Sequence, residues 1–445
     1  MTDATDLAQA ADPVPLLQRL IRFRSVNPPG DEGPCIGYLA DLLGRAGLDV
    51  KLVHLDPERP NLIARLPGRQ AAPALLLHAH ADVVPVAGQE WTVPPFDGLL
   101  ADGHVWGRGA IDMKGQLAMM ISAILTLRTA GQAPAGDVIL AISPDEEAGS
   151  AVGARYLTEQ HPELFTGIKD AIGEDGGAVI SCTGQRVHPI VVAEKRACWL
   201  RITLRGPAGH ASRQGRTGTA MAKLADLLGR LQSARLPAHL TPATDLMLSG
   251  LADLAAEPLA SRLQALRDDA LAPVPYDLLP EADAVYIDSV LRNTVNATIV
   301  RTSDKINILP ALITIDLDGR ILPGAWTADD YIGELREVIG AEPEIELLLE
   351  GEPMPAFAPG PFYDALACVL TEADPGGVPL PMVTPASTDA RLFAGLGIAC
   401  YGWMPMLTPP GSRYQDAMHA GDERIPVDAL RFGAECMRRV LVMDR

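Results

Sequence analysis

The stretch Leu75-Leu-Leu-His-Ala-His-Ala-Asp82 determines how the rest of the chain is interpreted. Its leading leucines predict a buried strand, and alternate side chains along a strand point to the same face. His78, His80 and Asp82 should therefore share one face at the carboxyl end of that strand, where ligands bind in open α/β sheets. Taken alone, the stretch would be better explained as a solvated edge strand with polar side chains.

Further acids come at comparable places along the chain. Asp145-Glu-Glu147 follows the apolar run Val138–Ile142, and Glu174-Asp-Gly-Gly177 follows another short apolar run. Asp112 comes at the end of a glycine-spaced turn that begins at Gly107. This turn lacks the G-x-G-x-x-G spacing of a dinucleotide loop, and a carboxylate there would repel phosphate. Each group alone would fit a solvated loop, but the strands deliver the acids to places where ligands are expected.

Convergence of these groups would crowd negative charge into one pocket, which is untenable unless divalent cations neutralise it. The acids concerned are Asp82, Asp112, Glu146, Glu147 and Asp175. Imidazole and carboxylate ligands without thiolates favour zinc, with cobalt or manganese as less favoured occupants. The six cysteines lie far apart with no C-x-x-C pair. That spacing argues against both a zinc ribbon and a disulfide scaffold.

The composition is that of a globular protein with two domains. The 445 residues exceed one ordinary core, because single cores rarely grow past about 250 to 300 residues. The net charge of −19 has the wrong sign for a protein that binds phosphate backbones, so nucleic acid is not expected as a partner. The first residues lack the basic and apolar regions of a signal peptide, and no stretch is apolar for long enough to span a bilayer. We therefore expect a cytoplasmic protein with no membrane partner.

The pattern of expected elements changes near Ala197. Before it, helical and strand patterns alternate, which favours an α/β sheet covered by helices. After it come a strand, a helix, a helical insertion to about Asp269, two strands, a helix and a strand, which without the insertion is a βαββαβ order. The tail from about Glu352 returns to mixed helix and short strand, so the pattern separates an interposed segment of residues 196–351 from residues 1–195 and 352–445, where the candidate zinc ligands lie.

Taken in order, these motifs resemble those of the dinuclear-zinc metallopeptidase family of aminoacylases, carboxypeptidase S, acetylornithine deacetylase and succinyl-diaminopimelate desuccinylase. The set consists of His80-x-Asp82, Gly109-Ala-Ile-Asp112-Met-Lys, Asp145-Glu-Glu147, Asp175-Gly-Gly and His419. The insertion after Leu231 is similar to that of the carboxypeptidase S and N-acyl-amino-acid hydrolase branch. The resemblance implies an aminopeptidase-like (phosphorylase/hydrolase-like) three-layer α/β catalytic domain with an inserted ferredoxin-like α+β domain, which serves as a lid and dimerises.

The resemblance also implies which residues hold two zinc ions in each subunit. One zinc would be held by His80 and Asp175, the other by Glu147 and His419, and Asp112 would bridge both.

Three more residues receive catalytic roles from the resemblance. Asp82 would orient His80, and Glu146 would be the general base that activates the water bridging the metals. His210 would stabilise the tetrahedral oxyanion from the lid of a partner subunit, which would make a homodimer functionally important.

Asn307, Arg320 and Arg391 match family positions that bind substrate, and arginine forks suit a carboxylate. A structural turn with a surface ion pair remains an alternative for Asn307 and Arg320. The role of His78 stays open among a partner of a ligand, a substrate contact and a packed bystander.

The predicted activity is hydrolysis of an amide bond in N-acyl amino acids or small peptides with a free carboxylate, as in a carboxypeptidase or an aminoacylase. A narrow deacetylase or desuccinylase of a biosynthetic intermediate is the alternative within the family. A catalytically silent peptide-binding homologue is a third possibility, although Glu146 and every expected ligand are present. The pair His78-x-His80 also resembles the start of barrel-type amidohydrolases, but the βαββαβ segment fits that fold poorly.

Overall fold

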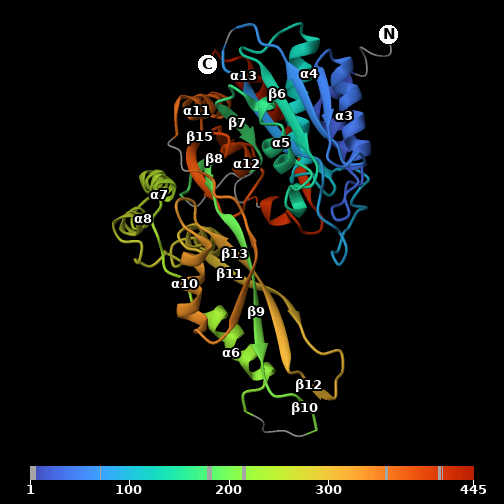
Figure 1. Cartoon of the computed structure of the whole chain (residues 1–445). Helices are drawn as coiled ribbons and strands as arrows, with labels where there is room; N and C mark the ends of the chain where they lie inside the picture. Colours follow the sequence, from blue (N-terminus) through green and yellow to red (C-terminus); the bar gives the residue numbers. More distant parts are fainter. Residues whose placement is uncertain are drawn as a thin grey trace. The chain divides into compact units, whose positions relative to one another are not determined.

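The computed structural model describes residues 7–70, 72–177, 183–212, 217–355, 359–408, 412 and 414–444. The chain forms two compact units (Figure 1). Unit 1 comprises residues 1–192, 357–382 and 388–445, and unit 2 comprises residues 193–356 and 383–387. Unit 1 is thus assembled from both ends of the chain, with unit 2 inserted between them.

Unit 1 is organised around a mixed sheet of eight strands in the order β1-β2-β6-β3-β7-β16-β8-β15. The central strand β3 pairs in parallel with both β6 and β7. Every residue of β3 and β6 is buried, as expected for apolar runs in the middle of a covered sheet. The strands are β1 (Asp49–Val53), β2 (Asn61–Leu66), β3 (Leu75–His80), β6 (Val138–Ser143), β7 (Asp170–Gly173), β8 (Arg186–Glu194), β15 (Gly377–Thr384) and β16 (Ala399–Gly402).

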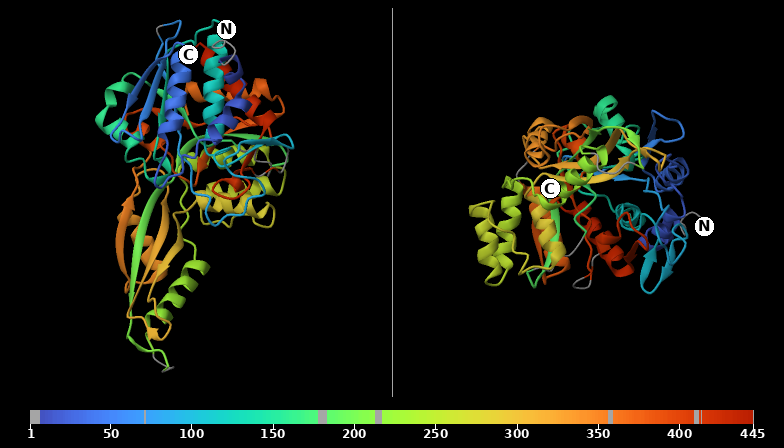
Figure 2. Two further views of the ribbon diagram at one scale, coloured as in Figure 1. Left: turned by 90° about the vertical axis from the view of Figure 1, so that its right-hand side faces the viewer. Right: turned by 90° about the horizontal axis from the view of Figure 1, so that it is seen from below.

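Helices cover both faces of this sheet and make a three-layer α/β unit (Figure 2). Helix α4 is buried along nearly its whole length and packs against β3, α2 and α13, because it is apolar on all sides. The helices are α2 (Pro13–Ile21), α3 (Gly33–Arg45), α4 (Lys114–Thr129), α5 (Ala154–Gln160), α11 (Pro361–Ala373), α12 (Ala390–Ala394) and α13 (Val427–Val442). A small sheet in the order β17-β5-β4 joins β4 (Leu99–Ala101), β5 (His104–Trp106) and β17 (Arg424–Pro426).

Unit 2 contains a four-stranded antiparallel sheet in the order β11-β13-β9-β14. Along the chain its main elements run β9-α6-β11-β13-α10-β14, which is the βαββαβ connectivity and strand order of a ferredoxin-like fold. The predicted fold class is therefore confirmed. These elements are β9 (Arg196–Arg205), α6 (Ala220–Ser233), β11 (Thr294–Arg301), β13 (Leu312–Ile321), α10 (Ala328–Ile339) and β14 (Glu344–Glu350).

The helical insertion of unit 2 lies between α6 and β11 and extends further along the chain than its predicted end near Asp269. It consists of three helices, α7 (Pro242–Leu254), α8 (Leu259–Asp268) and α9 (Glu281–Val290). The short strands β10 (Gly209–His210) and β12 (Ile308–Leu309) pair separately from the main sheet.

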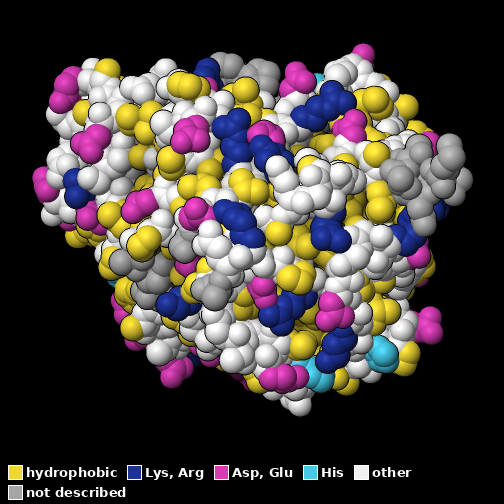
Figure 3. Space-filling view, turned by 90° about the horizontal axis from the view of Figure 1, so that it is seen from above, with side chains coloured by type: hydrophobic (Ala, Val, Ile, Leu, Met, Phe, Trp, Pro, Cys, Tyr) yellow, Lys and Arg dark blue, Asp and Glu magenta, His cyan; other side chains and the backbone are white. Residues whose placement is uncertain are grey.

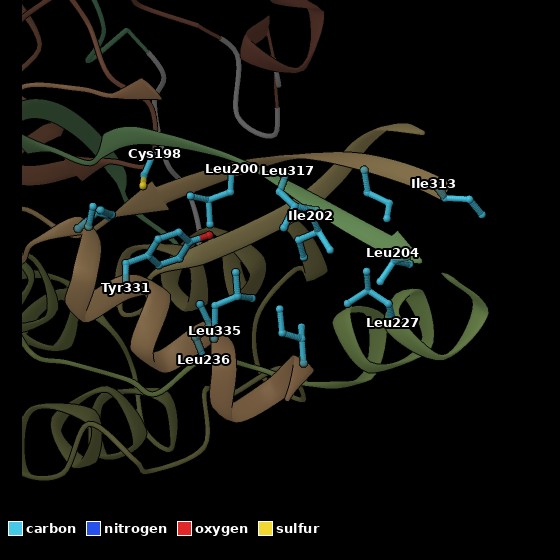
Figure 4. Packing of buried hydrophobic residues seen from close by; sticks show 14 of the residues in the cluster. Cys198, Leu200, Ile202, Leu204, Leu227, Leu236, Ile313, Leu317, Tyr331 and Leu335 are labelled. Atoms are coloured by element: carbon cyan, nitrogen blue, oxygen red, sulfur yellow. The ribbon is translucent and has the colours of Figure 1, made fainter. Parts of the chain in front are cut away.

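Alternation along the strands divides the sheet of unit 2 into an apolar face and a polar face. Leu200 and Ile202 of β9 are fully buried and pack toward Tyr331 and Leu335 of α10 (Figure 4). Arg201, which lies between them, belongs to the opposite face and is partly exposed. The two-residue period of the strands thus gives unit 2 its own core.

The molecular surface mixes charges of opposite sign. On the face drawn in Figure 3, Lys and Arg side chains lie across the middle, with Asp and Glu side chains between and around them. Ion pairs such as Arg65 with Asp137 and Arg438 with Glu435 belong to this mixed surface chemistry. Among the described residues, no helix has the length and apolar character needed to cross a membrane.

Candidate active site

Three neighbouring strands of unit 1 bring the candidate site together. β6, β3 and β7 lie side by side and run parallel, so the residues after them meet at one edge of the sheet. Asp82 follows β3, Glu146 and Glu147 follow β6, and Glu174 follows β7. His80 is the last residue of β3, and its side chain is almost completely buried.

The imidazole of His80 has a different partner on each ring nitrogen. Nδ1 lies 3.0 Å from the carbonyl oxygen of Asp82 and 3.5 Å from its carboxylate oxygen Oδ1. Nε2 lies 3.2 Å from Asp112 Oδ1 and 3.3 Å from Glu174 Oε2. A hydrogen on Nδ1 would donate to Asp82 and leave the lone pair of Nε2 directed at the two acids, which is the tautomer of a metal ligand.

Asp112 lies between two histidines. Its Oδ1 faces His80, whereas its Oδ2 lies 3.1 Å from Nε2 of His419. The same His419 nitrogen is 3.3 Å from Glu147 Oε2. Burial alone would raise the pKa of Asp112, but the hydrogen bonds from His419 and His80 lower it below its ordinary value. One carboxylate therefore connects two sets of nitrogen and oxygen ligands.

The carboxylate of Asp82 does more than face His80. It is fully buried and accepts the backbone N–H groups of Glu146 (3.2 Å) and Glu147 (3.1 Å) and the side-chain amide of Asn27 (2.9 Å). The two glutamates open the short 3₁₀ turn Glu146–Ala148, whose first N–H groups have no partner inside the turn. Asp82 thus fixes the backbone of both glutamates while it contacts His80.

The glutamates of the site, unlike Asp112, have pKa values above the ordinary value of a glutamate. Burial, followed by repulsion from Glu174, raises the pKa of Glu146 well above its ordinary value. Burial also raises the pKa of Glu174, to about 7, although His80 opposes this shift. The pKa of His419 rises to about 10 because it is hydrogen bonded to Asp112 and Glu147.

These residues fit divalent cations. The ligand atoms of His80, Glu146 and Glu174 lie within 4.8 Å of one another, as do those of His80, Asp112 and Glu147. Oε1 of Glu147 is buried and has no hydrogen-bond partner among the described residues. Buried and half-buried carboxylates grouped with imidazole, one of them with an unused oxygen, are the donors that zinc prefers in a site without thiolates.

The resemblance assigns a zinc-ligand role to Asp175, which in the structure lies in the turn after Glu174. The carboxylate of Asp175 accepts the N–H of Gly176 at 2.7 Å, and its backbone is left-handed, with φ of 77°. The carboxylate that reaches His80 belongs to Glu174. Asp before Gly is a turn signal, since Asp tolerates this conformation. That signal would have placed Asp175 in the turn and Glu174 at the end of the strand.

Two predicted site residues lie at the short strands of unit 2, His210 within β10 and Asn307 in the turn directly before β12. His210 is exposed, and its Nδ1 accepts the N–H of Ser212 at 3.2 Å. A neutral ring with Nδ1 as acceptor has its hydrogen on Nε2, which can then donate to a ligand. Asn307 is also exposed, and its carbonyl accepts the N–H of Ala211 at 3.0 Å. Asn307 and His210 are therefore neighbours within unit 2.

The two candidate arginines belong to different units. Arg320 of unit 2 donates to both carboxylate oxygens of Asp318, at 2.9 and 3.2 Å, and to the hydroxyl of Ser387 at 3.3 Å. Arg391 of unit 1 is buried and donates to the carbonyl of Thr388.

His78 is a buried neutral side chain next to the site. Its exposed fraction is 3%, and burial, followed by repulsion from His80, lowers its pKa to about 3. The ring packs 4.9 Å from that of Phe393, and a Cβ on Gly173 would collide with it. These contacts favour a packing role for His78.

Sequence reasoning missed several residues that shape the site. Asn27 bridges Asp82 and Asp145, and Arg59 binds Asp145 at 3.1 Å. Glu423 accepts four hydrogen bonds around the loop of Asp112. Asn27 and Arg59 stand in segments without any metal-ligand pattern, so their role follows only from the folded structure.

Comparison with known proteins gives consistent matches over most of the chain. A family model described as peptidase family M20/M25/M40 matches residues 76–443. A succinyl-diaminopimelate desuccinylase of Paracoccus denitrificans is 30% identical, with 97% of each chain covered. An aminoacylase-1 of Sus scrofa is 25% identical, with 93% of this chain and 90% of the relative covered. The structure of human carnosine dipeptidase 1 has a TM-score of 0.72 at 17% identity and covers 99% of this chain and 98% of its own.

Proposed function

The chain belongs to peptidase family M20/M25/M40, and from this membership and the site geometry we propose that it is a two-zinc amide hydrolase. Its substrates would be N-acyl amino acids or small peptides with a free carboxylate. Hydrolase activity on peptide or amide bonds is the property of the family, whereas the metal, the subunit assembly and the substrate are parts of the proposal.

The observation that carries the proposal is the position of Asp112. Its two carboxylate oxygens lie 3.2 Å from His80 and 3.1 Å from His419, so each oxygen faces a different imidazole. A carboxylate that divides its oxygens in this way is suited to bridge two cations, as in enzymes with paired metals.

The proposed ligands follow from the contacts around Asp112. His80 and Glu174 would hold one zinc, Glu147 and His419 the other, and Asp112 would bridge them. Glu174 replaces the Asp175 of the sequence-based assignment, because the Glu174 carboxylate lies beside His80. Bound zinc would polarise the amide carbonyl and make a coordinated water more acidic.

Glu146 would transfer the proton between the two halves of the reaction. It would take the proton from the attacking water and return it to the leaving amine. Its carboxylate is grouped with His80 and Glu174, and burial favours its protonated form. Asp82 would support this role by holding the backbone N–H of Glu146 at 3.2 Å.

The free carboxylate of the proposed substrates is assigned to two arginines that match substrate-binding positions of the family. Arg391 in unit 1 and Arg320 in unit 2 offer planar guanidinium groups that can bind a carboxylate with two parallel hydrogen bonds. Arg320 already makes such a paired contact with Asp318, which a substrate carboxylate would replace. Asn307 would add an amide beside His210.

A homodimer through unit 2 forms part of the proposal. The edge strand β11 has exposed Ile299 and Val300, both at 45%. The other edge strand, β14, also exposes Leu347 and Leu348, but beside the charged residues Glu344 and Glu346. Charged side chains protect an edge against pairing, and exposed apolar ones favour it. A second copy pairing at β11 would present its own His210 to this chain.

A specific observation favours a narrower second candidate. The desuccinylase relative matches 97% of this chain at 30% identity, which favours a deacylase that removes a dicarboxylic acyl group from one biosynthetic intermediate. Such an enzyme would cleave N-succinyl amino acids and leave N-acetyl amino acids and dipeptides intact.

The test is a panel of N-acetyl, N-succinyl and long-chain N-acyl amino acids and dipeptides, assayed before and after chelation. Cleavage that is lost on chelation and restored by zinc supports the proposal, and the preferred substrate decides between the two candidates. Two bound zinc ions without cleavage of any panel member would contradict the proposed substrate class.

The trans role of His210 has its own test. Mixed His210→Ala and Glu146→Ala subunits should recover part of the wild-type rate, since a heterodimer would contain one intact site. Proven subunit exchange without any recovery would remove His210 from a role across the dimer.

A further inference from the structure

We propose that Glu423 is a positioning residue that holds the loop of Asp112 and the segment of His419 in register before any cation binds. The inference rests on the proposed function at one point only, namely that Asp112 and His419 share a cation. It concerns a residue that contacts neither the expected metals nor the substrate.

The small sheet of unit 1 delivers Glu423 to the loop of Asp112. Strand β17 begins at Arg424 and pairs antiparallel with β5, so that Arg424 lies opposite Trp106. One residue earlier, the carbonyl of Glu423 accepts the N–H of Gly107 at 2.9 Å, which continues the ladder. The side chain of Glu423 consequently points into the turn that begins at Gly107.

The carboxylate of Glu423 is fully buried and accepts hydrogen bonds at both oxygens. Oε1 accepts the backbone N–H groups of Ile111 (2.7 Å) and Asp112 (3.1 Å). Oε2 accepts the N–H of Gly109 (3.0 Å) and the Arg108 guanidinium (2.6 Å). Three of the four donors are backbone groups of one loop, so the carboxylate fixes the path of the chain into Asp112.

The same network reaches His419 from the other side. The Arg108 guanidinium also donates to the carbonyl of Ala420 (3.1 Å) and to the side-chain oxygen of Gln89 (2.5 Å). The side-chain amide of Gln89 in turn donates to the carbonyl of His419 at 2.8 Å. Glu423, Arg108 and Gln89 thus connect the backbone at Asp112 to the backbone at His419.

A carboxylate is the side chain that this position needs. It offers acceptors at both oxygens and has no hydrogen of its own, so it can serve four donors at once. A glutamine has the same shape but presents an NH₂ group to donors at one of the two positions. Glu423→Gln should therefore release one side of the Asp112 loop while it leaves the packing volume unchanged.

The first measurement follows backbone hydrogen exchange in the full-length metal-free protein. Glu423→Gln should speed exchange about tenfold or more in peptides covering residues 107–112 and 418–423, with the central strands β3 and β6 unchanged. This measurement contains no metal, so it tests Glu423 even if the wild type binds no zinc and the proposed function fails.

The second measurement is a zinc titration against a competing chelator. Glu423→Gln should weaken one of the two binding steps about 10- to 100-fold, the usual effect of a residue that orients ligands, and leave the other within about threefold. In turnover, kcat should fall while KM stays within about threefold, because the substrate contacts are not altered.

A double variant separates positioning from simple ion-pair stability. Arg108→Gln with Glu423→Gln removes both buried charges and should recover part of the thermal stability lost in Glu423→Gln alone. It should not recover zinc affinity, because the amides of Ile111 and Asp112 would still lack the carboxylate. Recovery of both properties would show that only the ion pair matters and would overturn the proposal.

The matched control is Asp422→Asn, in the same segment. Its carboxylate accepts the N–H and the hydroxyl of Thr92 rather than the Asp112 loop, so zinc titration and exchange at 107–112 should match the wild type. If Glu423→Gln does not fold, Gln89→Leu should still speed exchange at 418–423. Wild-type exchange and titration in Glu423→Gln, or in Gln89→Leu if that variant replaces it, would overturn the proposal.

Discussion

Asp112 in unit 1 and Asp316 in unit 2 both lie between two basic side chains, and the basic partners differ. In unit 1, Asp112 lies between two histidines, at 3.2 and 3.1 Å. In the sheet of unit 2, Asp316 lies between Arg201, at 2.7 Å, and Arg301. Both carboxylates use both oxygens, but arginine is always charged, whereas a histidine is cationic only when protonated.

The difference in basic partners shows which of the two carboxylates can be neutralised by a metal ion instead of by a charged side chain. Asp316 is neutralised permanently within the chain, and the hydrogen bonds from Arg201 lower its pKa to about 2. The partners of Asp112 can release protons and then offer lone pairs, which are the groups that a metal needs. The arrangement in unit 2 is therefore structural, and the arrangement in unit 1 is suited to bind cations.

The largest expected effect is on turnover in unit 1. Glu146→Gln should lower kcat about 10³-fold, since the amide cannot take a proton and general bases contribute about 10²- to 10⁴-fold. Folding and zinc stoichiometry should remain those of the wild type, as measured by circular dichroism and metal analysis. Glu159→Gln, an exposed acid of α5, is the control. A wild-type rate in Glu146→Gln would remove Glu146 from the mechanism.

Removal of the metal should destabilise unit 1 and leave unit 2 unchanged. Zinc at about 100 times its dissociation constant stabilises the folded state by about 3 kcal/mol per site, so chelation should lower the unfolding free energy by that amount. Hydrogen exchange should locate the loss in unit 1, around Asp112 and Glu147, while β9 and β13 of unit 2 keep their protection. Equal loss of protection in both units would contradict the claim that cations bind in unit 1 and not in unit 2.

Neighbouring acids after β7 give a sharper test of the ligands. Glu174→Gln should weaken one zinc-binding step about 10- to 100-fold, because its carboxylate faces His80. Asp175→Asn should change zinc affinity less than threefold, since asparagine tolerates the left-handed backbone and can still accept the N–H of Gly176. Isothermal titration with zinc measures both variants. The reverse order of effects would return the ligand role to Asp175.

This pair also shows where sequence reasoning stops. The sequence predicts which groups of residues converge, and the structure does bring His80, Asp112, Glu147 and His419 together. Choosing between Glu174 and Asp175 requires the exact backbone of the turn, because a shift by one residue redirects the side chain. The ferredoxin-like fold of unit 2 was predictable, since connectivity and two-residue alternation are local properties of the sequence.

The supporting residues depend on contacts between distant segments. Glu423 and the Asp112 backbone are separated by 311 residues along the chain, and Asn27 and Asp145 by 118. In the sequence, Glu423 looks like any other glutamate, because its burial and its four hydrogen-bond donors exist only in the folded structure. Glu423 follows His419 by four residues, but its function becomes visible only when the loop of Asp112 folds against it.

The smallest expected effect is on unit 2. Asp316→Asn should lower the unfolding free energy by about 1 kcal/mol at pH 7, because a partly buried carboxylate with two arginine partners contributes more than a typical surface ion pair. The folded-state pKa of about 2 lies below the unfolded value of about 3.9, so this stability is present above pH 4 and is lost as pH falls toward 2. Urea unfolding of wild type and variant between pH 7 and pH 3 measures the difference, with the exposed Asp304→Asn as control. A difference that stays constant with pH would mean that the charge of Asp316 does not stabilise unit 2, and the contrast with Asp112 would then rest on geometry alone.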